Sequence, residues 1–70
     1  MVYSRLAILL AERLMTISEL HRQTGINRVT LTSLYKRKSK GISFATLSQI
    51  CKALDCSVGD ILEYREDLEG

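Results

Sequence analysis

Apolar residues recur at intervals of three and four along most of this chain, which is the spacing of one face of an α-helix. The first stripe predicts a helix from about Ser4 to Met15, with Ser4 as its cap, and consists of Leu6, Leu9, Leu10 and Leu14. Thr16 to Glu19 then form a capping box, in which each of the two end residues accepts a bond from the amide of the other. A second helix is therefore predicted from Ile17 to Thr24, and Gly25 ends it because glycine adopts the left-handed conformation at little cost.

Three further helices follow the same logic. Asn27 caps a helix predicted from about Arg28 to Arg37, and the polar, basic segment Lys36 to Gly41 is interpreted as a loop. Ser43 caps a fourth helix, whose apolar stripe is Phe44, Leu47, Ile50, Cys51 and Leu54. Ser57 starts a short fifth helix with Asp60 three residues later, and this helix carries Val58, Ile61 and Leu62. No segment alternates with period two over five or more residues, so the prediction is an all-α fold without a sheet, a compact bundle of five short helices.

Length and composition set the class of protein. The chain has 70 residues, enough for one domain spanning residues 1–70, and 46% apolar and 26% charged residues are typical of a folded domain. The longest apolar run, Leu6 to Ala11, is too short to cross a bilayer, so we expect a cytoplasmic protein without a membrane partner. No second domain is available to sense a ligand, and neither a small-molecule ligand nor a cofactor is expected.

Catalytic and metal chemistry are disfavoured by the residues available for them. His21 is the only histidine, neither Cys51 nor Cys56 has an evident base beside it, and no glycine loop could cradle a phosphate, so an enzyme is not expected. Two cysteines and one distant histidine cannot complete a zinc shell. Each cysteine occupies a position where periodicity expects an apolar residue, so both are interpreted as buried thiols rather than as a disulfide or metal ligands.

The net charge of +2 conceals an uneven distribution of charge along the chain. From His21 to Leu54 there is no acidic residue and there are seven basic ones, namely Arg22, Arg28, Lys36, Arg37, Lys38, Lys40 and Lys52. After Leu54 six acidic residues outweigh the single base Arg65. A basic middle suits a polyanionic partner, although a solvated basic loop would have the same composition.

The segment from Ile17 to Lys36 has the pattern of a helix-turn-helix motif, in which a short helix, a glycine turn and a second helix follow one another. Four residues are predicted to close the wedge between the two helices from inside: Leu20, Ile26, Leu31 and Leu34. Once these point inward, geometry leaves the outer side of the second helix to Arg28, Val29, Thr32, Ser33 and Lys36.

Further residues carry a resemblance to a known family. Thr16-Ile17-Ser18-Glu19-Leu20, Thr24-Gly25-Ile26 and Leu31-Thr32-Ser33-Leu34 resemble the frame of the phage-repressor and Cro-type (XRE) helix-turn-helix regulators. The later runs Phe44 to Leu47, Ile50 to Leu54 and Gly59 to Leu62 are similar to the last two helices of compact members. The resemblance implies a lambda-repressor-like fold and a transcriptional regulator that binds double-stranded operator DNA as a dimer.

The same resemblance assigns DNA contacts to individual residues. It places Arg28, Val29, Thr32 and Ser33 at base edges and Asn27, Lys36, Lys38 and Lys40 on the DNA backbone. Arg37 joins the backbone group because four charges in five positions, from Lys36 to Lys40, suit phosphate contacts. The sequence departs from the family in having Ile17 where glutamine commonly grips a phosphate, so that contact is lost or passes to Thr16. His21 also replaces a small residue, and it is interpreted as a partly exposed packing residue.

Several alternatives stay open at this stage. The helix-turn-helix fold also serves protein-interaction modules such as antirepressors and adaptors, and Ile17 mildly favours that function while the basic run opposes it. Arg28 could be a solvated charge, and Val29 could pack locally as well as contact a thymine methyl. Tyr35, Phe44 and Met15 are interpreted as core residues rather than stacking platforms. A homodimer is expected at least on DNA, with candidate contact residues Leu14, Ile61, Leu62 and Tyr64.

Overall fold

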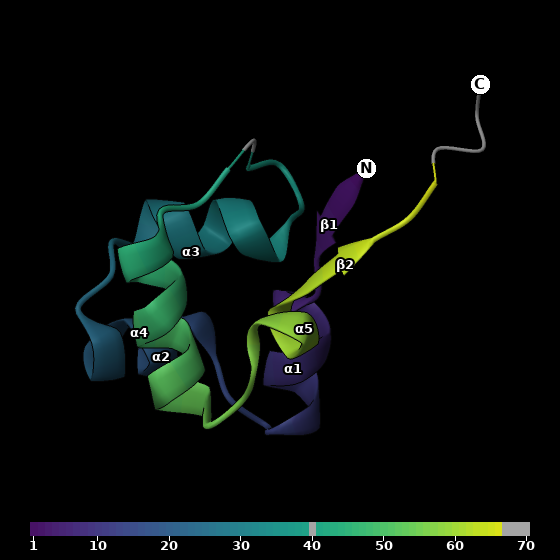
Figure 1. Ribbon diagram of the computed structural model, residues 1–70. Coiled ribbons are helices and arrows are strands. Elements are labelled where there is room, and N and C mark those ends of the chain that lie inside the picture. Colours follow the sequence, from purple (N-terminus) through teal and green to yellow (C-terminus); the bar gives the residue numbers. More distant parts are fainter. Residues whose placement is uncertain (40, 67–70) are drawn as a thin grey trace.

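The computed structural model describes residues 1–39 and 41–66, in which five short helices surround one core and the two ends of the chain meet in a small sheet (Figure 1). The elements in chain order are β1 (Val2–Ser4), α1 (Leu6–Glu12), α2 (Ile17–Thr24), α3 (Arg28–Tyr35), α4 (Phe44–Leu54), α5 (Val58–Ile61) and β2 (Leu62–Tyr64). The predicted five-helix bundle is therefore confirmed. None of the helices in the described ranges is long and apolar enough to span a membrane.

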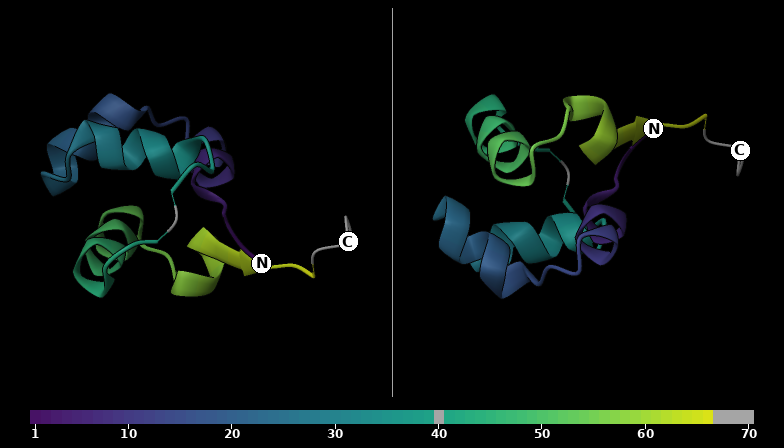
Figure 2. Two further views of the ribbon diagram at one scale, coloured as in Figure 1. Left: turned by 90° about the horizontal axis from the view of Figure 1, so that it is seen from above. Right: turned by 90° about the horizontal axis from the view of Figure 1, so that it is seen from below.

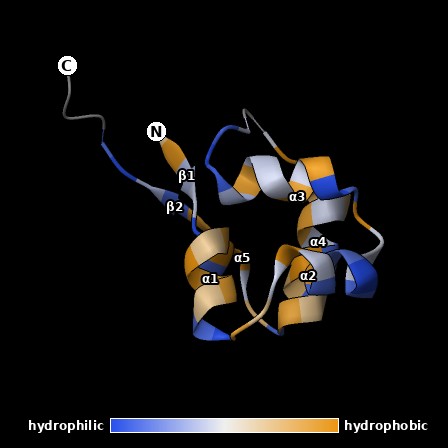
Figure 3. Cartoon of the chain, turned by 180° about the vertical axis from the view of Figure 1, so that it is seen from behind, coloured by the Kyte–Doolittle hydropathy of each residue, from blue (hydrophilic) through white to orange (hydrophobic). Residues whose placement is uncertain are grey.

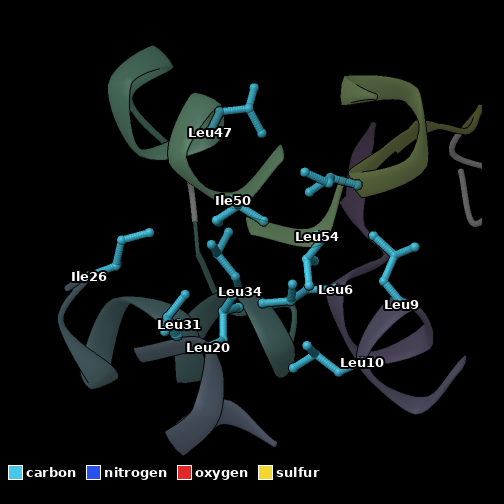
Figure 4. Packing of buried hydrophobic residues seen from close by; sticks show 11 residues of the cluster. Leu6, Leu9, Leu10, Leu20, Ile26, Leu31, Leu34, Leu47, Ile50 and Leu54 are labelled. Carbon is cyan, nitrogen blue, oxygen red and sulfur yellow. The ribbon is translucent and has the colours of Figure 1, made fainter. Parts of the chain in front are cut away.

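The core consists of aliphatic side chains that all five helices and the turn before α3 contribute. Six of these side chains are at most 1% exposed, namely Leu6, Leu10, Leu20, Leu31, Ile50 and Ile61. Figure 4 shows side chains from α1, α2, α3 and α4 pointing toward one another across the middle of the molecule. Leu20, Ile26, Leu31 and Leu34 are all buried, which confirms the predicted wedge between α2 and α3.

The predicted bounds of α2 and the predicted starts of α4 and α5 are confirmed, because side chains cap these helices as expected. At α2 the Glu19 amide donates to Thr16 Oγ1 over 3.1 Å, and the Thr16 amide donates to Glu19 Oε1 over 3.0 Å. At α4 the hydroxyl of the cap residue Ser43 accepts a bond from the Thr46 amide. At α5 the Ser57 amide and hydroxyl both donate to the Asp60 carboxylate, and these bonds lower the pKa of Asp60. The prediction that the fifth helix carries Leu62 is wrong, since α5 ends at Ile61 and Leu62 begins β2.

The first and third helices are shorter than predicted. α1 begins at Leu6 rather than at Ser4, because Ser4 lies in β1 and its hydroxyl accepts a bond from the Leu6 amide over 3.2 Å. α1 ends at Glu12, and Leu14 leaves the helical conformation with φ of 53°. α3 ends at Tyr35, since Arg37 has φ of 59° and stops the helix two residues before its predicted end.

A left-handed residue follows each of the first four helices. These residues are Leu14, Gly25, Arg37 and Asp55, with φ between 51° and 76°. After three of these residues, the backbone amide of the following residue donates to the carbonyl five positions before it. The Met15 amide, for example, donates to the Leu10 carbonyl over 2.9 Å. Such a bond satisfies a carbonyl that the end of a helix leaves without a partner. Only Gly25 adopts this conformation without the steric cost that a Cβ atom imposes.

The expectation that the chain has no sheet is wrong. β1 and β2 pair antiparallel, with Val2 opposite Tyr64, Tyr3 opposite Glu63 and Ser4 opposite Leu62. Each strand has three residues, which is too few to show a period-two pattern. The pairing also joins residues 2–4 to residues 62–64. Local sequence rules cannot anticipate a contact between residues so far apart along the chain.

The prediction that Tyr35 and Phe44 lie in the core is also wrong. Phe44 is 87% exposed and Tyr35 is 42% exposed, whereas Met15 packs against the core as predicted. Phe44 is the first residue of α4 and lies one turn before Leu47, the first residue of the stripe that the core buries. Helical spacing assigned Phe44 to the correct stripe, but the core does not extend to this end of α4.

The two cysteines are free thiols, as predicted, and they are half-buried rather than fully buried. Cys51 lies in α4 and Cys56 follows it, and the Cys56 amide donates to the Cys51 carbonyl over 3.0 Å. Partial burial and the neighbouring thiol raise the pKa of Cys56. The described residues contain no group of three or more histidines, cysteines and acids that could hold a metal ion.

The left-handed conformation of Leu14 generates a stability prediction. Leu14 is 91% exposed, so the side chain contributes little burial, and glycine at this position should remove a steric cost of about 1 kcal/mol. We expect Leu14→Gly to raise the midpoint of thermal unfolding by about 4–8 °C, measured by circular dichroism. Leu14→Ala is the matched control, because alanine keeps the Cβ atom and should give no comparable gain. An equal rise in both variants would contradict the explanation.

Candidate nucleic-acid interface

The turn between α2 and α3 is fixed by side-chain hydrogen bonds. Thr24 Oγ1 donates to the Leu20 carbonyl over 2.8 Å and accepts a bond from the Ile26 amide over 3.1 Å. His21 Nδ1 lies 2.6 Å from the Ile26 carbonyl oxygen, so the imidazole bonds to the turn and is half-buried there. This position confirms the interpretation of His21 as a partly exposed packing residue. Together with the left-handed Gly25, these bonds set the direction in which α3 leaves the turn.

Asn27 begins α3 and determines its first turn. The Asn27 side-chain oxygen accepts a bond from the Val29 amide over 2.6 Å, as expected of a cap. Behind it, Leu31 and Leu34 are buried against the core, so the opposite side of α3 faces solvent. This solvent-exposed side of α3 is the side whose residues were predicted from the sequence to contact DNA.

The predicted contact residues form one continuous surface on α3. Arg28, Val29 and Lys36 are exposed, and Thr32 and Ser33 are half-buried between them. Together with Lys38 these residues line a shallow groove of about 330 Å³. We call this surface the α3 groove, and its lining is Arg28, Val29, Thr32, Ser33, Lys36 and Lys38. Val29 is 73% exposed, so local packing does not account for it.

Three of the six residues that line the α3 groove are basic and none is acidic, and Glu63 of the C-terminal part pairs with other bases. Figure 3 colours the segment that directly follows α3 hydrophilic. Glu63 in β2 bonds to Arg65 over 2.8 Å and lies 3.7 Å from Arg5, so its charge is held at the sheet. Arg65 lowers the pKa of Glu63, and this carboxylate is therefore ionised at neutral pH.

Four of the predicted backbone-contact residues lie outside the α3 groove or outside the described ranges: Thr16, Asn27, Arg37 and Lys40. Thr16 caps α2, and its hydroxyl also donates to Glu19 Oε1 over 3.2 Å. Arg37 Nε donates to the Ser4 carbonyl over 3.0 Å, and the guanidinium lies 5.8 Å from the centre of the Tyr3 ring. Lys40 lies outside the described residues.

No pattern in the sequence singles out Tyr3 or Arg65. The Tyr3 ring has Arg37 at 5.8 Å and Arg65 at 5.7 Å from its centre, so one aromatic ring contacts two cations. Arg37 thereby connects the end of α3 to the β1–β2 sheet. No local motif marks these residues, because the three positions come from both ends and the middle of the chain.

Ile17, the apolar residue at the usual glutamine position of the family, is half-buried and packs against the core. Its apolar character is therefore explained by packing at the start of α2.

The chain matches the family model of the Cro/C1-type HTH DNA-binding domain over residues 5–67. This match spans α1 to β2, including the whole α2–turn–α3 unit. The chain belongs to the Cro/C1-type helix-turn-helix family. It is a DNA-binding transcription regulator and not an enzyme, and the recognition of an XRE-type regulator from its sequence is confirmed.

Relatives of this Cro/C1-type protein agree with that assignment. It is 48% identical over 60 residues to the uncharacterized HTH-type transcriptional regulator YozG of Bacillus subtilis (strain 168), covering 86% of this chain and 71% of YozG. The crystal structure of the transcriptional regulator VanUg superposes with a TM-score of 0.77 at 33% identity, covering 94% of this chain and 87% of VanUg. A crystal structure from Bacteroides fragilis has a TM-score of 0.78 at 24% identity, covering 90% of this chain and 100% of that one, and it supports the fold alone.

The contacts of Arg37 in this Cro/C1-type protein generate a second stability prediction. Arg37→Ala removes a hydrogen bond to the Ser4 carbonyl and a cation–π contact with Tyr3, and should lower the free energy of unfolding by about 1–2 kcal/mol. Urea unfolding monitored by circular dichroism measures the change. Lys38→Ala is the control, since Lys38 is exposed in the α3 groove and should leave stability unchanged. Equal losses in the two variants would show that the Arg37 contacts do not stabilise the fold.

Proposed function

We propose that residues 1–70 form one domain that binds operator DNA sequence-specifically, with α3 in the major groove. The observation that carries the proposal is the α3 groove, in which base-contact and phosphate-contact residues line one exposed surface. An α-helix fits the major groove of B-DNA, and residues at its N-terminal end reach the base edges. Because bacterial DNA lies in the cytoplasm and the relative YozG is bacterial, the proposal includes a cytoplasmic location.

Base reading is assigned to the first half of α3. Arg28 is the first residue of the helix and is exposed, which suits a pair of hydrogen bonds to guanine. Val29 presents an apolar surface that suits the methyl group of thymine. Thr32 and Ser33 lie one turn further along the same surface, where their hydroxyls can donate to or accept from base edges.

Backbone contacts are assigned to the two ends of α3 and to the loop beyond it. Asn27 lies at the start of the helix, and Lys36 and Lys38 are exposed at its end. Lys40, in the same basic segment of the sequence, is assigned the same role. Thr16 and Arg37 complete the proposed set, but both already have intramolecular partners, so we assign them less of the binding energy than Lys36 and Lys38.

A homodimer on DNA is part of the proposal. One helix-turn-helix unit reads only a few base pairs, and two units on a symmetric site bring two recognition helices into successive major grooves. The predicted operator is therefore a pseudo-palindrome whose half-sites lie about 10 base pairs apart, centre to centre. Selection of bound sequences from a random duplex pool tests both the specificity and the symmetry.

Arg28→Ala tests the base contact. The variant should lose about 1–3 kcal/mol of affinity for the selected operator, which corresponds to roughly 5- to 150-fold in the dissociation constant. Its preference at one base pair of each half-site should disappear at the same time. Fluorescence anisotropy with the operator and with single-base variants measures both quantities. Lys52→Ala is the control, because Lys52 lines a different depression, beside Gln23 and Gln49.

Phosphate contacts are tested by the dependence of affinity on salt. The logarithm of the binding constant should fall steeply between 50 and 200 mM salt, and Lys38→Gln should reduce the slope by about 0.9. Lys52→Gln should leave the slope unchanged. Affinity that is insensitive to salt would contradict the assignment of Lys36, Lys38 and Lys40 to the DNA backbone. If neither the wild type nor a Lys38→Glu/Lys40→Glu variant bound any duplex, the protein-interaction module would be the better function.

A further inference from the structure

The two thiols of this chain meet where α4 ends. The Cys56 amide donates to the Cys51 carbonyl over 3.0 Å, and the Asp55 amide donates to the Lys52 carbonyl over 3.4 Å. Asp55 has the left-handed φ of 51°. These features define a Schellman motif, in which the side chains at the two ends of the longer bond are frequently in contact. In this chain the residues at both ends of that bond are cysteines.

The backbone bond limits how far apart the two cysteines can lie. The covalent bonds on either side of a 3.0 Å hydrogen bond allow the Cα atoms of Cys51 and Cys56 to be at most about 7 Å apart. Disulfides join Cα atoms up to about that separation. The side chains also affect each other, because partial burial raises the pKa of Cys56 and the charge and hydrogen bonding of Cys51 raise it further. The pair is therefore within the reach of a disulfide.

The surrounding structure holds both cysteines in place. Cys51 belongs to α4, and Arg13 Nε donates to the Leu54 carbonyl in the last turn of this helix over 3.2 Å. The capping box that begins α5 follows directly after Cys56. Both thiols are half-buried, so a small reagent can reach them. Two groups that the fold already holds close together react with each other far faster than they react with free molecules.

We propose that Cys51 and Cys56 form an oxidation site, at which a low-molecular-weight disulfide such as glutathione disulfide converts the two thiols into one intramolecular disulfide. In both views of Figure 2, α4 and α5 lie on one side of the molecule and α2 and α3 on the other. Neither cysteine lines the α3 groove, so the site is separate from the proposed DNA contact. In the cytoplasm, where we place this protein, thiols are kept reduced, and the disulfide is therefore a transient product of oxidation.

The reaction consists of two successive thiol–disulfide exchanges. The Cys51 thiol loses its proton, and the thiolate attacks one sulfur of glutathione disulfide, which forms a Cys51–glutathione bond and releases one glutathione thiolate. The Cys56 thiol then loses its proton and attacks the Cys51 sulfur, which forms the Cys51–Cys56 bond and releases the second glutathione thiolate. The two protons pass through solvent to the released thiolates, and the two electrons of the pair reduce glutathione disulfide to two molecules of glutathione.

The order of the two steps follows from the environment of Cys56. Its raised pKa keeps the thiol protonated at neutral pH, and a protonated thiol is a poor nucleophile toward a free disulfide. Proximity compensates for this only in the second step, in which Cys56 attacks within the chain.

Mass spectrometry after incubation with glutathione disulfide tests the pairing. The wild type should lose both thiols and the mass of two hydrogen atoms, and the cross-linked monomer should exceed the glutathione adducts by about tenfold or more. Cys56→Ser cannot complete the second step and should accumulate the Cys51–glutathione adduct. Cys51→Ser is the matched control, and it should react more slowly than Cys56→Ser because only Cys56 remains. Circular dichroism checks that both serine variants fold.

Unfolding of the wild type tests whether the fold holds the two thiols together, and this measurement needs no variant. At one ratio of glutathione disulfide to glutathione, the oxidised fraction of the folded chain should exceed that of the chain in concentrated urea. The disulfide should accordingly raise the midpoint of thermal unfolding by about 4–8 °C. Dithiothreitol should restore both thiols and reverse the rise.

Several results would overturn the proposal. They are a wild type that keeps its thiols at every ratio, one that accumulates glutathione adducts on both cysteines, and one that forms covalent dimers through them. A disulfide that forms as readily in urea as in the folded chain, or that lowers the midpoint of unfolding, would equally contradict it. None of these measurements involves DNA, so a failure of the proposed operator binding would leave their outcome unchanged.

Discussion

The packing of α3 against α2 is the constraint on which the rest of this structure depends. Leu20, Ile26, Leu31 and Leu34 are all at most 8% exposed, and they fill the angle between the two helices. Burial of these side chains fixes the rotation of α3 about its own axis. That rotation leaves Arg28, Val29, Thr32 and Ser33 at the surface, so the position of the proposed DNA-contact residues follows from the burial of the residues between them.

A second interaction fixes the far end of α3. Arg37 leaves the helix in a left-handed conformation and bonds to Ser4, and its guanidinium contacts Tyr3. α3 is thereby held at its start by Asn27 and the turn, and at its end by β1. A small domain has few buried contacts to hold a helix in place, so these polar attachments matter more than they would in a larger protein. They also connect the end of α3 to β1.

Basic and acidic residues occupy different parts of this fold. Basic residues of the middle segment lie on α3 and in the loop after it, while Glu63 bonds to Arg65 at the sheet. Among the described residues, the ion pairs join Glu63 to Arg5 and Arg65, and none involves a base of the α3 groove. A surface whose lining holds three bases and no acid suits a polyanionic partner.

The sequence by itself determined the elements whose causes are local: the capping boxes at Thr16 and Ser57, the cap at Ser43, the glycine turn, and the stripes that assigned Leu20, Leu31, Leu34 and Ile50 to the core. Caps and stripes act between residues three or four apart, so a single chain displays them. Only the tertiary structure decided the pairing of β1 with β2, the exposure of Phe44 and the direction of Arg37. Each of these depends on where a distant part of the chain lies. The end of the core along α4 and the proximity of the two chain ends are properties of the packed molecule, and no short segment encodes them.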